Sequence, residues 1–183
     1  MLKIETGYLK GSSFDTVPSK KTRYTPSQLR RTLINIFEIS DYNLLEVFGG
    51  SGSFSFEAIS NYAKSSTIIE QSSKSVNIIK NNSKKLGIEN EINVIKGDFR
   101  TIIPELKKNN QKYDMIFADP PFNLGFVEEF LKVIDNNSEI LIDGAYIIIE
   151  KSKRENYNYT PLNLELDEIR NYGDIDLLIY FRK

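Results

Sequence analysis

The residues best suited to chemistry form the tetrapeptide Asp119-Pro120-Pro121-Phe122, which follows an apolar run at 113–118. Two consecutive prolines fix the backbone and remove two N–H donors, so the neighbouring carbonyl groups point outward. Asp119 and the carbonyl of Pro120 can then accept hydrogen bonds from one planar amine, while Phe122 stacks on the ring that carries this amine. The tetrapeptide therefore predicts group transfer to an exocyclic amine, and a rigid loop after a buried strand is the alternative.

The residue types that are missing exclude most other chemistry. The 183-residue chain contains neither Cys nor His, which excludes disulfides, thiol nucleophiles, Ser-His-Asp triads and the commonest metal ligand. Methyl transfer to an amine needs none of these groups. The amine becomes strongly acidic only after the methyl has arrived, so Asp119 need not be a strong base. We expect no metal site.

A glycine-rich sequence, Leu45-Glu46-Val47-Phe48-Gly49-Gly50-Ser51-Gly52, begins within the apolar run at 44–48. Such a turn between a strand and a helix lets a ligand approach the backbone closely. The G-x-G-x-x-G spacing of dinucleotide sites fails at Ser55, and Glu46 would repel a diphosphate. A carboxylate suits the ammonium and sulfonium groups of S-adenosylmethionine instead, although a purely structural turn is the alternative. We predict that this cofactor contacts Glu46, Phe48, Gly49, Gly50, Ser51 and Gly52.

Two further acids follow later apolar runs. Glu70 lies about 20 residues beyond the glycine turn, where an acid commonly binds ribose hydroxyls. Asp98 is placed to accept a hydrogen bond from an adenine amine, and Phe99 offers an apolar wall beside it. Each acid alone could equally be a helix N-cap, but three acids near three successive strand ends favour a cofactor site. The predicted cofactor contacts therefore also include Glu70, Gln71, Asp98, Phe99 and Asp119.

Apolar runs alternate with amphipathic stretches from residue 44 onward. The runs at 44–48, 67–70, 92–95, 113–118 and 145–150 predict strands, and the stretches near 53–62, 73–86, 100–108 and 124–136 predict helices. This alternation implies a parallel sheet covered on both faces. Alternating leucines at 162–166, a turn at 171–174 and the run 175–181 predict an antiparallel hairpin. The expected fold is α/β and Rossmann-like, with a mainly parallel seven-stranded sheet that ends in an antiparallel hairpin, the arrangement of class I methyltransferases.

The charge is divided unevenly along the chain. Residues 1–31 hold seven basic and two acidic side chains, a net charge of +5, whereas the remaining 152 residues hold 17 basic and 23 acidic side chains, a net charge of −6. Residues 7–24 are expected to form an irregular arm. A helix should follow, with Thr25 as N-cap and an apolar side formed by Leu29, Leu33, Ile34, Ile36 and Phe37. A basic arm and helix (1–43) on an acidic domain (44–183) indicates a polyanionic partner, and a solvated tail is the alternative.

Membrane association is not expected from this sequence. No run of about 18 apolar residues is present, and the N-terminus lacks the apolar core of a signal peptide. We therefore expect a soluble, cytoplasmic protein.

These motifs together resemble the RsmD-type small-subunit ribosomal RNA guanine-N2 methyltransferases over nearly the whole chain. The family's L-D-x-F-A-G-S-G loop is similar to residues 45–52, its L-E-A-L-S segment to 56–60, and its D-P-P-[FY] element to 119–122. Glu70, Glu150 and the Tyr172-Gly173 turn also fall where the family has them. D-P-P-[FY] alone is shared with adenine-N6 and cytosine-N4 methyltransferases, whereas its combination with the arm and the short length is more specific.

The resemblance implies S-adenosylmethionine-dependent methylation of a guanine N2 amine in small-subunit (16S) ribosomal RNA, free or in an assembling subunit, by a monomer. It also implies phosphate contacts from the arm, where the family's Asp-Arg pair is replaced by Ser27-Gln28; the predicted RNA-binding residues are Lys10, Lys20, Lys21, Arg23, Thr25, Arg30 and Arg31. Glu46 and Gly49 stand where the family has Asp and Ala. The alternatives are an adenine-N6 methyltransferase, a nicotinamide-dependent dehydrogenase, and a catalytically silent RNA-binding module.

Overall fold

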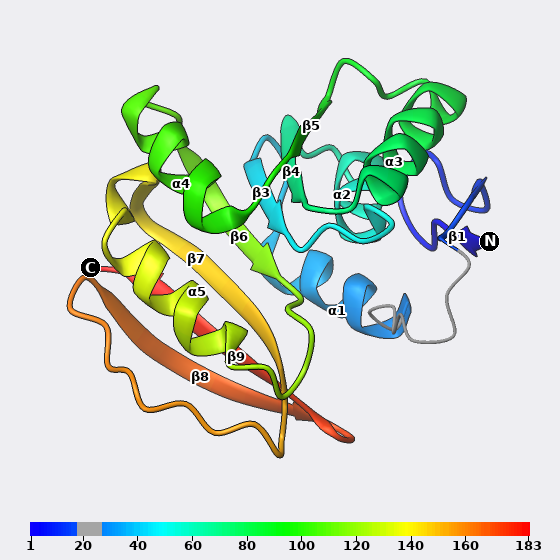
Figure 1. The fold of residues 1–183 in the computed structure, drawn as a ribbon. Coiled ribbons are helices and arrows are strands. Elements are labelled where there is room, and N and C mark those ends of the chain that lie inside the picture. The colour runs from blue at the N-terminus through cyan, green and yellow to red at the C-terminus, as the bar shows by residue number, and fades with distance from the viewer. Residues whose placement is uncertain (18–26) are drawn as a thin grey trace. The chain divides into compact units, whose positions relative to one another are not determined.

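The computed structural model describes residues 1–17 and 27–183. The chain divides into two compact units, Met1–Gly97 and Asp98–Lys183. Each unit contains parallel strands that alternate with helices (Figure 1). No helix within the described ranges is long and apolar enough to cross a lipid bilayer.

Three parallel strands form the centre of the first unit, in the order β5 (Ile92–Lys96), β4 (Ser65–Glu70) and β3 (Asn43–Val47). The pairing runs from Asn43↔Ser65 to Val47↔Ile69 and from Ser66↔Ile92 to Glu70↔Lys96. Helices α2 (Ser53–Ser60) and α3 (Ser73–Leu86) form the crossovers. Because the carboxyl ends of the strands are aligned, the residues that follow them lie at one edge, where ligands bind in open α/β sheets.

Helix α1 (Ser27–Phe37) is the helix predicted before the sheet, and its predicted first residues Thr25 and Pro26 lie outside the described residues. Leu29, Leu33 and Ile34 are buried as expected, whereas Ile36 is 39% exposed. The buried face of α1 includes Arg30 instead of Ile36. Residues 30, 33 and 34 share one side of a helix because they are three and four positions apart. The apolar side predicted for this helix was therefore wrong at Ile36.

The N-terminal residues 1–17 pack on α2 rather than forming an irregular arm throughout. Strands β1 (Leu2–Lys3) and β2 (Ser13–Phe14) pair antiparallel, and the backbone N–H of Tyr8 donates to the carbonyl of Ser60 at 2.9 Å. At Gly7 (φ 76°) an added Cβ would lie 1.8 Å from the same carbonyl oxygen, so this close approach requires glycine. The described part of the arm belongs to the first unit, and the division at residue 43 stays a prediction.

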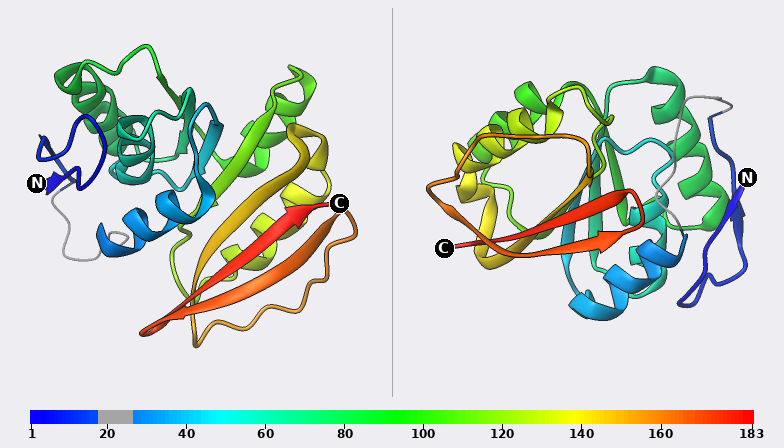
Figure 2. Two further views of the ribbon diagram at one scale, coloured as in Figure 1. Left: turned by 180° about the vertical axis from the view of Figure 1, so that it is seen from behind. Right: turned by 90° about the horizontal axis from the view of Figure 1, so that it is seen from below.

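The second unit contains α4 (Phe99–Lys108), β6 (Tyr113–Ala118), α5 (Phe126–Asp135), a short 3-10 turn (Ser138–Ile140), β7 (Leu141–Ser152), β8 (Leu164–Tyr172) and β9 (Ile175–Arg182). Its strands lie in the order β6-β7-β9-β8; β6 and β7 are parallel, and the other pairs are antiparallel. Figure 2 shows β8 and β9 as the long hairpin predicted from the sequence. Leu162 is 81% exposed and precedes β8, whose outward charges suit an edge strand.

The described chain thus has the α/β fold predicted from the sequence. It contains a seven-stranded sheet in which the early strands pair in parallel and the last strands form the antiparallel hairpin. Five helices accompany the strands in the described ranges. Nearly every residue of β6 and of 147–150 in β7 is buried, as expected for strands covered on both faces.

Candidate active site

The glycine loop, defined here as residues 48–52, follows β3 and is hydrogen-bonded to the carboxyl end of β4. Its backbone turns sharply: Phe48, Gly50 and Gly52 have φ values of 64°, 54° and 72°. The N–H of Gly49 donates to the carbonyl of Ile69 at 3.1 Å, and the N–H of Gly50 donates to Oε2 of Glu70 at 2.8 Å. A positive φ at a bulky residue such as Phe48 is strained, and such strain gathers at ligand sites.

Close packing explains why glycine occupies two positions of this loop. A Cβ added at Gly49 would lie 2.2 Å from Cγ2 of Ile68, which is fully buried in β4. Gly52 is the N-cap of α2 in the left-handed region, and a Cβ there would lie 3.2 Å from both Ile79 and Phe56. One side of the loop therefore packs against Ile68 of the sheet and against Ile79 and Phe56 of the helices. The backbone on its other side is shaped for a ligand.

Glu46 is 4% exposed and is bound to the start of α2. Its Oε2 accepts hydrogen bonds from the backbone N–H of Ser55, at 3.0 Å, and from the Ser55 hydroxyl. The Ser55 hydroxyl also lies 2.7 Å from Oγ of Ser66 in β4. The carboxylate therefore satisfies an otherwise free N–H of the first helical turn, and Ser55, where a dinucleotide site would have glycine, takes part in this bond. Contact between Glu46 and a cationic cofactor stays a prediction.

Glu70 lies at the carboxyl end of a strand, as the sequence predicts, and its binding of a ribose stays a prediction. It ends β4 and is half-buried, and its two oxygens accept from Gly50 N at 2.8 Å and Ser72 N at 2.7 Å. Each carboxylate oxygen has a second lone pair, so both can also accept from ribose hydroxyls. Gln71, next in sequence, is exposed. Glu70 thus joins the glycine loop to the start of α3.

The donor set of the glycine loop fits a polar organic ligand. Ser51 is 2% exposed, and its hydroxyl has no hydrogen-bond partner within the described part of the chain. A buried hydroxyl without a partner is unusual and calls for a ligand or ordered water. No group of His, Cys, Asp and Glu side chains that could hold a metal ion occurs among the described residues. Ser51, the loop backbone and Glu70 together match the ribose and amino-acid groups of S-adenosylmethionine.

Asp98 begins α4 in the second unit and is its N-cap. Its Oδ1 accepts from the backbone N–H and Nε of Arg100, both at 2.9 Å, and its Oδ2 pairs with the same guanidinium at 2.6 Å. The hydrogen bonds from Arg100 lower the pKa of Asp98, so it stays ionised. Asp98 is therefore a helix N-cap, as the alternative interpretation of this acid held. Its carboxylate has further lone pairs, and a contact with an adenine amine stays a prediction.

Phe99 is the first residue of α4 and lies in the core of the second unit. Its side chain is 4% exposed and meets the rings of Phe126 and Phe130 edge to face, with centroids 6.4 and 5.9 Å apart. The ring therefore packs between α4 and α5, as expected for a residue on the apolar side of α4. Phe99 is thus a core residue, and its role as an apolar wall beside the adenine stays a prediction.

The proline loop, defined here as residues 119–125, follows β6. Pro120 is buried, Pro121 is exposed, and Asp119 and Phe122 are half-buried. Asn123 and Gly125 close the loop with φ values of 58° and 78°. The predicted loop directly after a buried strand is thus present, with its acid and its ring partly accessible.

Glu155 is a residue of this site that the sequence analysis missed. It is 6% exposed, and its two oxygens accept from the backbone N–H groups of Asn123, at 2.8 Å, and Gly125, at 3.2 Å. The Asn-x-Gly pattern at 123–125 indicates a turn. Its acceptor lies 30 residues away in the connection after β7, however, and no local pattern points to it.

The predicted RNA-binding residues fall into three groups. Lys10 and Arg31 are exposed, and Lys20, Lys21, Arg23 and Thr25 lie outside the described residues. Arg30 is 1% exposed, and its Nε lies 3.8 Å from Oε2 of Glu57. Burial lowers the pKa of Arg30, and the charge of Glu57 opposes this effect. A guanidinium buried in this way does not reach a phosphate, so the prediction for Arg30 is corrected to a structural role.

Comparisons with known proteins agree with the motifs. The family model described as Conserved hypothetical protein 95 matches residues 2–181. The chain is 35% identical to the Ribosomal RNA small subunit methyltransferase D of Buchnera aphidicola, over 88% of this chain and 82% of that protein. A solved structure named putative methyltransferase yhhF, from Escherichia coli, superposes with a TM-score of 0.84 at 26% identity and covers 100% of this chain and 98% of its own.

A more distant structure shares the fold. An RNA methyltransferase from Salinibacter ruber, solved in complex with S-adenosyl-L-homocysteine, has a TM-score of 0.66 at 12% identity over 87% of this chain and 94% of that one. This likeness concerns the fold alone and confirms the Rossmann-like methyltransferase architecture. Because the family model spans nearly the whole chain and the Buchnera relative exceeds 30% identity, the chain belongs to the Conserved hypothetical protein 95 family, the RsmD-type family that its motifs predict.

Proposed function

We propose that this chain transfers a methyl group from S-adenosylmethionine to the N2 amine of a guanine in small-subunit ribosomal RNA. The observation that carries the proposal is the proline loop at the end of β6, with Asp119 and Phe122 half-buried and its closing turn held by Glu155. The names of the curated relatives support ribosomal RNA of the small subunit as the substrate class. The choice of the guanine N2 amine rests on the family resemblance.

The cofactor would be held by residues that the sequence and the structure single out. Glu70 offers lone pairs to the ribose, Ser51 a buried hydroxyl, and the glycine loop its backbone N–H and carbonyl groups. Asp98 remains the predicted acceptor for the adenine amine, and Glu46 and Gln71 complete the proposed set. When bound, S-adenosylmethionine supplies an electrophilic methyl group on a sulfonium.

The proline loop would prepare the nucleophile. Asp119 and the carbonyl of Pro120 accept hydrogen bonds from the exocyclic amine, while Phe122 stacks on the base, a contact of about 1–3 kcal/mol. These bonds hold the nitrogen lone pair towards the methyl carbon. As the new N–C bond forms and the S–C bond breaks, the nitrogen loses one proton, which Asp119 accepts or passes to water. The target base must be unstacked first, at a cost of a few kcal/mol.

RNA would be held by cations of the N-terminal region. Lys10 and Arg31 are exposed, and Lys20, Lys21 and Arg23 are proposed from the sequence alone. Phosphate contacts release counterions, so binding should weaken as salt rises. Action on free RNA or on an assembling subunit, a cytoplasmic location and a monomeric state belong to the same proposal.

One assay tests the proposal. The protein is incubated with methyl-labelled S-adenosylmethionine and either unmodified small-subunit ribosomal RNA or assembled small subunits lacking the modification, and the labelled nucleoside is identified. We expect N2-methylguanosine. Label in N6-methyladenosine would overturn the guanine assignment. Cofactor binding without transfer to either substrate would favour a silent RNA-binding module.

The role of Asp119 is tested separately. Asp119→Ala should abolish transfer and leave the Kd for S-adenosylmethionine largely unchanged. Asp167→Ala, in the exposed edge strand β8 of the same unit, is the matched control and should behave as wild type. Equal loss of transfer and of cofactor affinity in Asp119→Ala would mean that Asp119 serves mainly the cofactor.

A further inference from the structure

The turn that closes the proline loop is held by contacts from outside its own sequence. Asn123 has a φ of 58° and Gly125 a φ of 78°, both in the left-handed region. Asn and Gly enter this region more readily than other residues, so they permit the turn without fixing it. Leu124 between them is 66% exposed, so packing of this side chain does not fix the turn. Two hydrogen bonds to Glu155, at 2.8 and 3.2 Å, hold its backbone.

Glu155 is itself firmly anchored within the second unit. Its backbone N–H donates to the carbonyl of Ser152 at 3.0 Å, and its carbonyl accepts from Nζ of Lys151 at 3.1 Å. Nζ of Lys151 also lies 3.3 Å from Oδ2 of Asp176 in β9. The carboxylate is therefore presented from the end of β7 at a fixed place, and hydrogen bonds from N–H groups to a carboxylate are stronger than neutral ones.

We propose that Glu155 is a positioning residue that sets the shape of the proline loop for methyl transfer. This inference rests on the proposed function, in which Asp119 to Phe122 receive the target amine. Both carboxylate oxygens are needed as acceptors, because each receives a different backbone N–H. Glutamine at this position would turn an NH2 group towards one of these donors. Loss of one bond would free the turn, and a displacement of about 1 Å at a reacting group lowers rates about 100-fold.

Glu155→Gln is the test, and Glu128→Gln is its matched control. Glu128 accepts from Asn158 N at 2.8 Å, so it holds the same connection after β7, and within the described residues it makes no hydrogen bond to the proline loop. We expect Glu155→Gln to lower kcat about 10- to 100-fold, with the Kd for S-adenosylmethionine and the Tm close to wild type. Glu128→Gln should retain kcat. Glu155→Asp, which keeps both acceptors on a shorter side chain, should fall between the two.

A spectroscopic readout separates positioning from general stability. The chain contains no Trp, so Leu124→Trp places a single fluorescent reporter in the proline loop. Adding Glu155→Gln to this variant should lower the anisotropy of the reporter, and adding Glu128→Gln should not. Unchanged anisotropy, or equal loss of kcat in both glutamine variants, would overturn the inference. If Asp119→Ala retained transfer, the proposed function would fail instead, and this result is distinct from retention of activity in Glu155→Gln.

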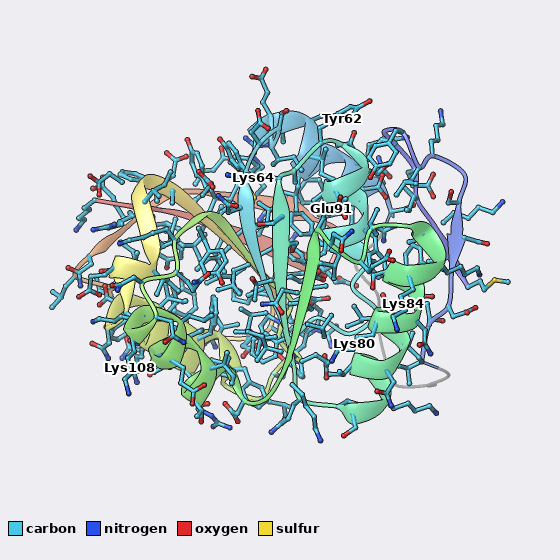
Figure 3. All side chains as sticks on the ribbon, turned by 90° about the horizontal axis from the view of Figure 1, so that it is seen from above. Tyr62, Lys64, Lys80, Lys84, Glu91 and Lys108 are labelled. Carbon is cyan, nitrogen blue, oxygen red and sulfur yellow. The ribbon has the colours of Figure 1, made fainter. Side chains whose placement is uncertain are left out.

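Helix α3 carries a second, independent feature. It contains no acidic residue, and its four lysines, Lys74, Lys80, Lys84 and Lys85, are all exposed. Figure 3 shows Lys80 and Lys84 extending from this helix. None of the four forms an ion pair with a residue in 1–17 or 27–183, whereas Lys107, Lys132 and Lys151 of the second unit are paired with Glu139, Glu128 and Asp176.

Helix stability does not account for these cations. Lys84 and Lys85 in the last turn suit the helix dipole, but Lys74 lies in the first turn, where the dipole favours an anion. The inner face of α3 is joined to the N-terminal segment, since Asn82 accepts from Asp15 N at 3.0 Å and donates to Asp15 O at 2.8 Å. The sequence continues from Asp15 into the predicted RNA-binding residues Lys20, Lys21 and Arg23.

We infer that the exposed face of α3 is a further contact surface for the ribosomal RNA substrate. Unpaired lysines separated by exposed asparagines, Asn77 and Asn81, match the phosphate and hydroxyl groups of an RNA backbone. This inference deepens the proposed function by adding a binding surface outside the predicted arm.

The test is the salt dependence of binding to an unmodified small-subunit ribosomal RNA transcript. Lys80→Gln/Lys84→Gln should weaken binding and lower the slope of log Kd against log salt by about 1.4 to 1.8, the value for two lost phosphate contacts. Lys64→Gln/Lys108→Gln removes the same charge from two exposed lysines outside α3 (Figure 3) and should change the slope little. An unchanged slope in the α3 variant, or an equal change in both, would overturn the inference. Failure of the wild type to bind the transcript would count against the proposed function.

Discussion

Replacement of Glu57 by Gln should destabilise the first unit strongly, because Glu57 is the centre of a buried charged cluster. It lies on α2 with no exposed surface. Its carboxylate accepts from Glu5 N at 3.0 and 3.1 Å and from Thr6 N and Thr6 Oγ1, each at 2.7 Å. The guanidinium of Arg30 lies 3.8 Å away, with 1% of each side chain exposed. Glu57→Gln keeps the volume of the side chain but removes its charge.

The expected loss follows from what remains buried. An arginine keeps its positive charge in a folded protein, so Glu57→Gln leaves an uncompensated guanidinium in the interior. Breaking a buried ion pair by removal of one partner costs about 3–5 kcal/mol. For a chain of this size, each kcal/mol corresponds to about 2–4 °C in Tm, so the variant should melt about 6–20 °C lower. Arg30→Met should cost less, because the carboxylate keeps its four hydrogen bonds from three donors of Glu5 and Thr6.

Urea unfolding followed by circular dichroism gives the free energies, and a double-mutant cycle isolates the pair. Glu57→Gln/Arg30→Met removes both charges and should be more stable than Glu57→Gln alone. Limited proteolysis supplies a local readout, because residues 1–17 should be cleaved sooner when the charged acceptor on α2 is replaced by an amide. A Glu57→Gln variant within about 0.5 kcal/mol of wild type, or single-variant effects that simply add in the double variant, would refute the reasoning.

Three further predictions follow from the packing and the charges. Gly49→Ala should lower stability by about 1–3 kcal/mol, because the new Cβ would lie 2.2 Å from Cγ2 of Ile68; Ile68→Leu, which lacks this branching methyl, should relieve the loss in a thermal melt. Glu70→Gln should raise the Kd for S-adenosylmethionine about 10- to 100-fold in a calorimetric titration while the chain stays folded; unchanged affinity would remove Glu70 from the proposed cofactor site. Burial works to raise the pKa of Asp135, but hydrogen bonds from Tyr159, Leu162 and Asn163 outweigh it and lower this pKa. The stabilisation from Asp135 is therefore present above the ordinary aspartate pKa of about 3.9 and is lost as pH falls through the folded value. Asp135→Asn should accordingly be less stable at pH 7 and lose less stability between pH 5 and pH 2, as measured by urea midpoints; parallel curves for variant and wild type would contradict this assignment.

Local patterns were sufficient for the seven strands of the main sheet and for the family, but they did not indicate the short strands β1 and β2. The spacing of apolar residues predicts β4, β5, β6 and their crossover helices. A helix on the sheet buries one apolar stripe, whereas a strand covered on both sides buries both of its faces. The glycine loop and the proline loop were predicted because their backbone shapes depend on glycine and proline themselves.

Burial at single positions was predicted less well. Arg30 was expected on an exposed basic face, yet it occupies the buried side of α1 because Glu57 on α2 supplies an opposite charge there. Phe99 was expected to offer an apolar wall beside the adenine, and the structure adds that its ring packs edge to face on Phe126 and Phe130. In both cases the deciding partner is distant in sequence, so composition near the residue could not indicate it.

By itself, the sequence determined the reaction class expected of this chain. The absence of Cys and His leaves few chemistries, and Asp119-Pro120-Pro121-Phe122 after an apolar strand needs only its own acceptors and ring. Only the tertiary structure decided which charges are used for stability and which remain available for a ligand. It showed that Glu57 and Arg30 stabilise each other in the interior, that Glu155 holds the turn of the proline loop, and that the lysines of α3 remain exposed. The reason is physical: the free energy of a charged group depends on what surrounds it in space, and those surroundings come from segments far apart along the chain.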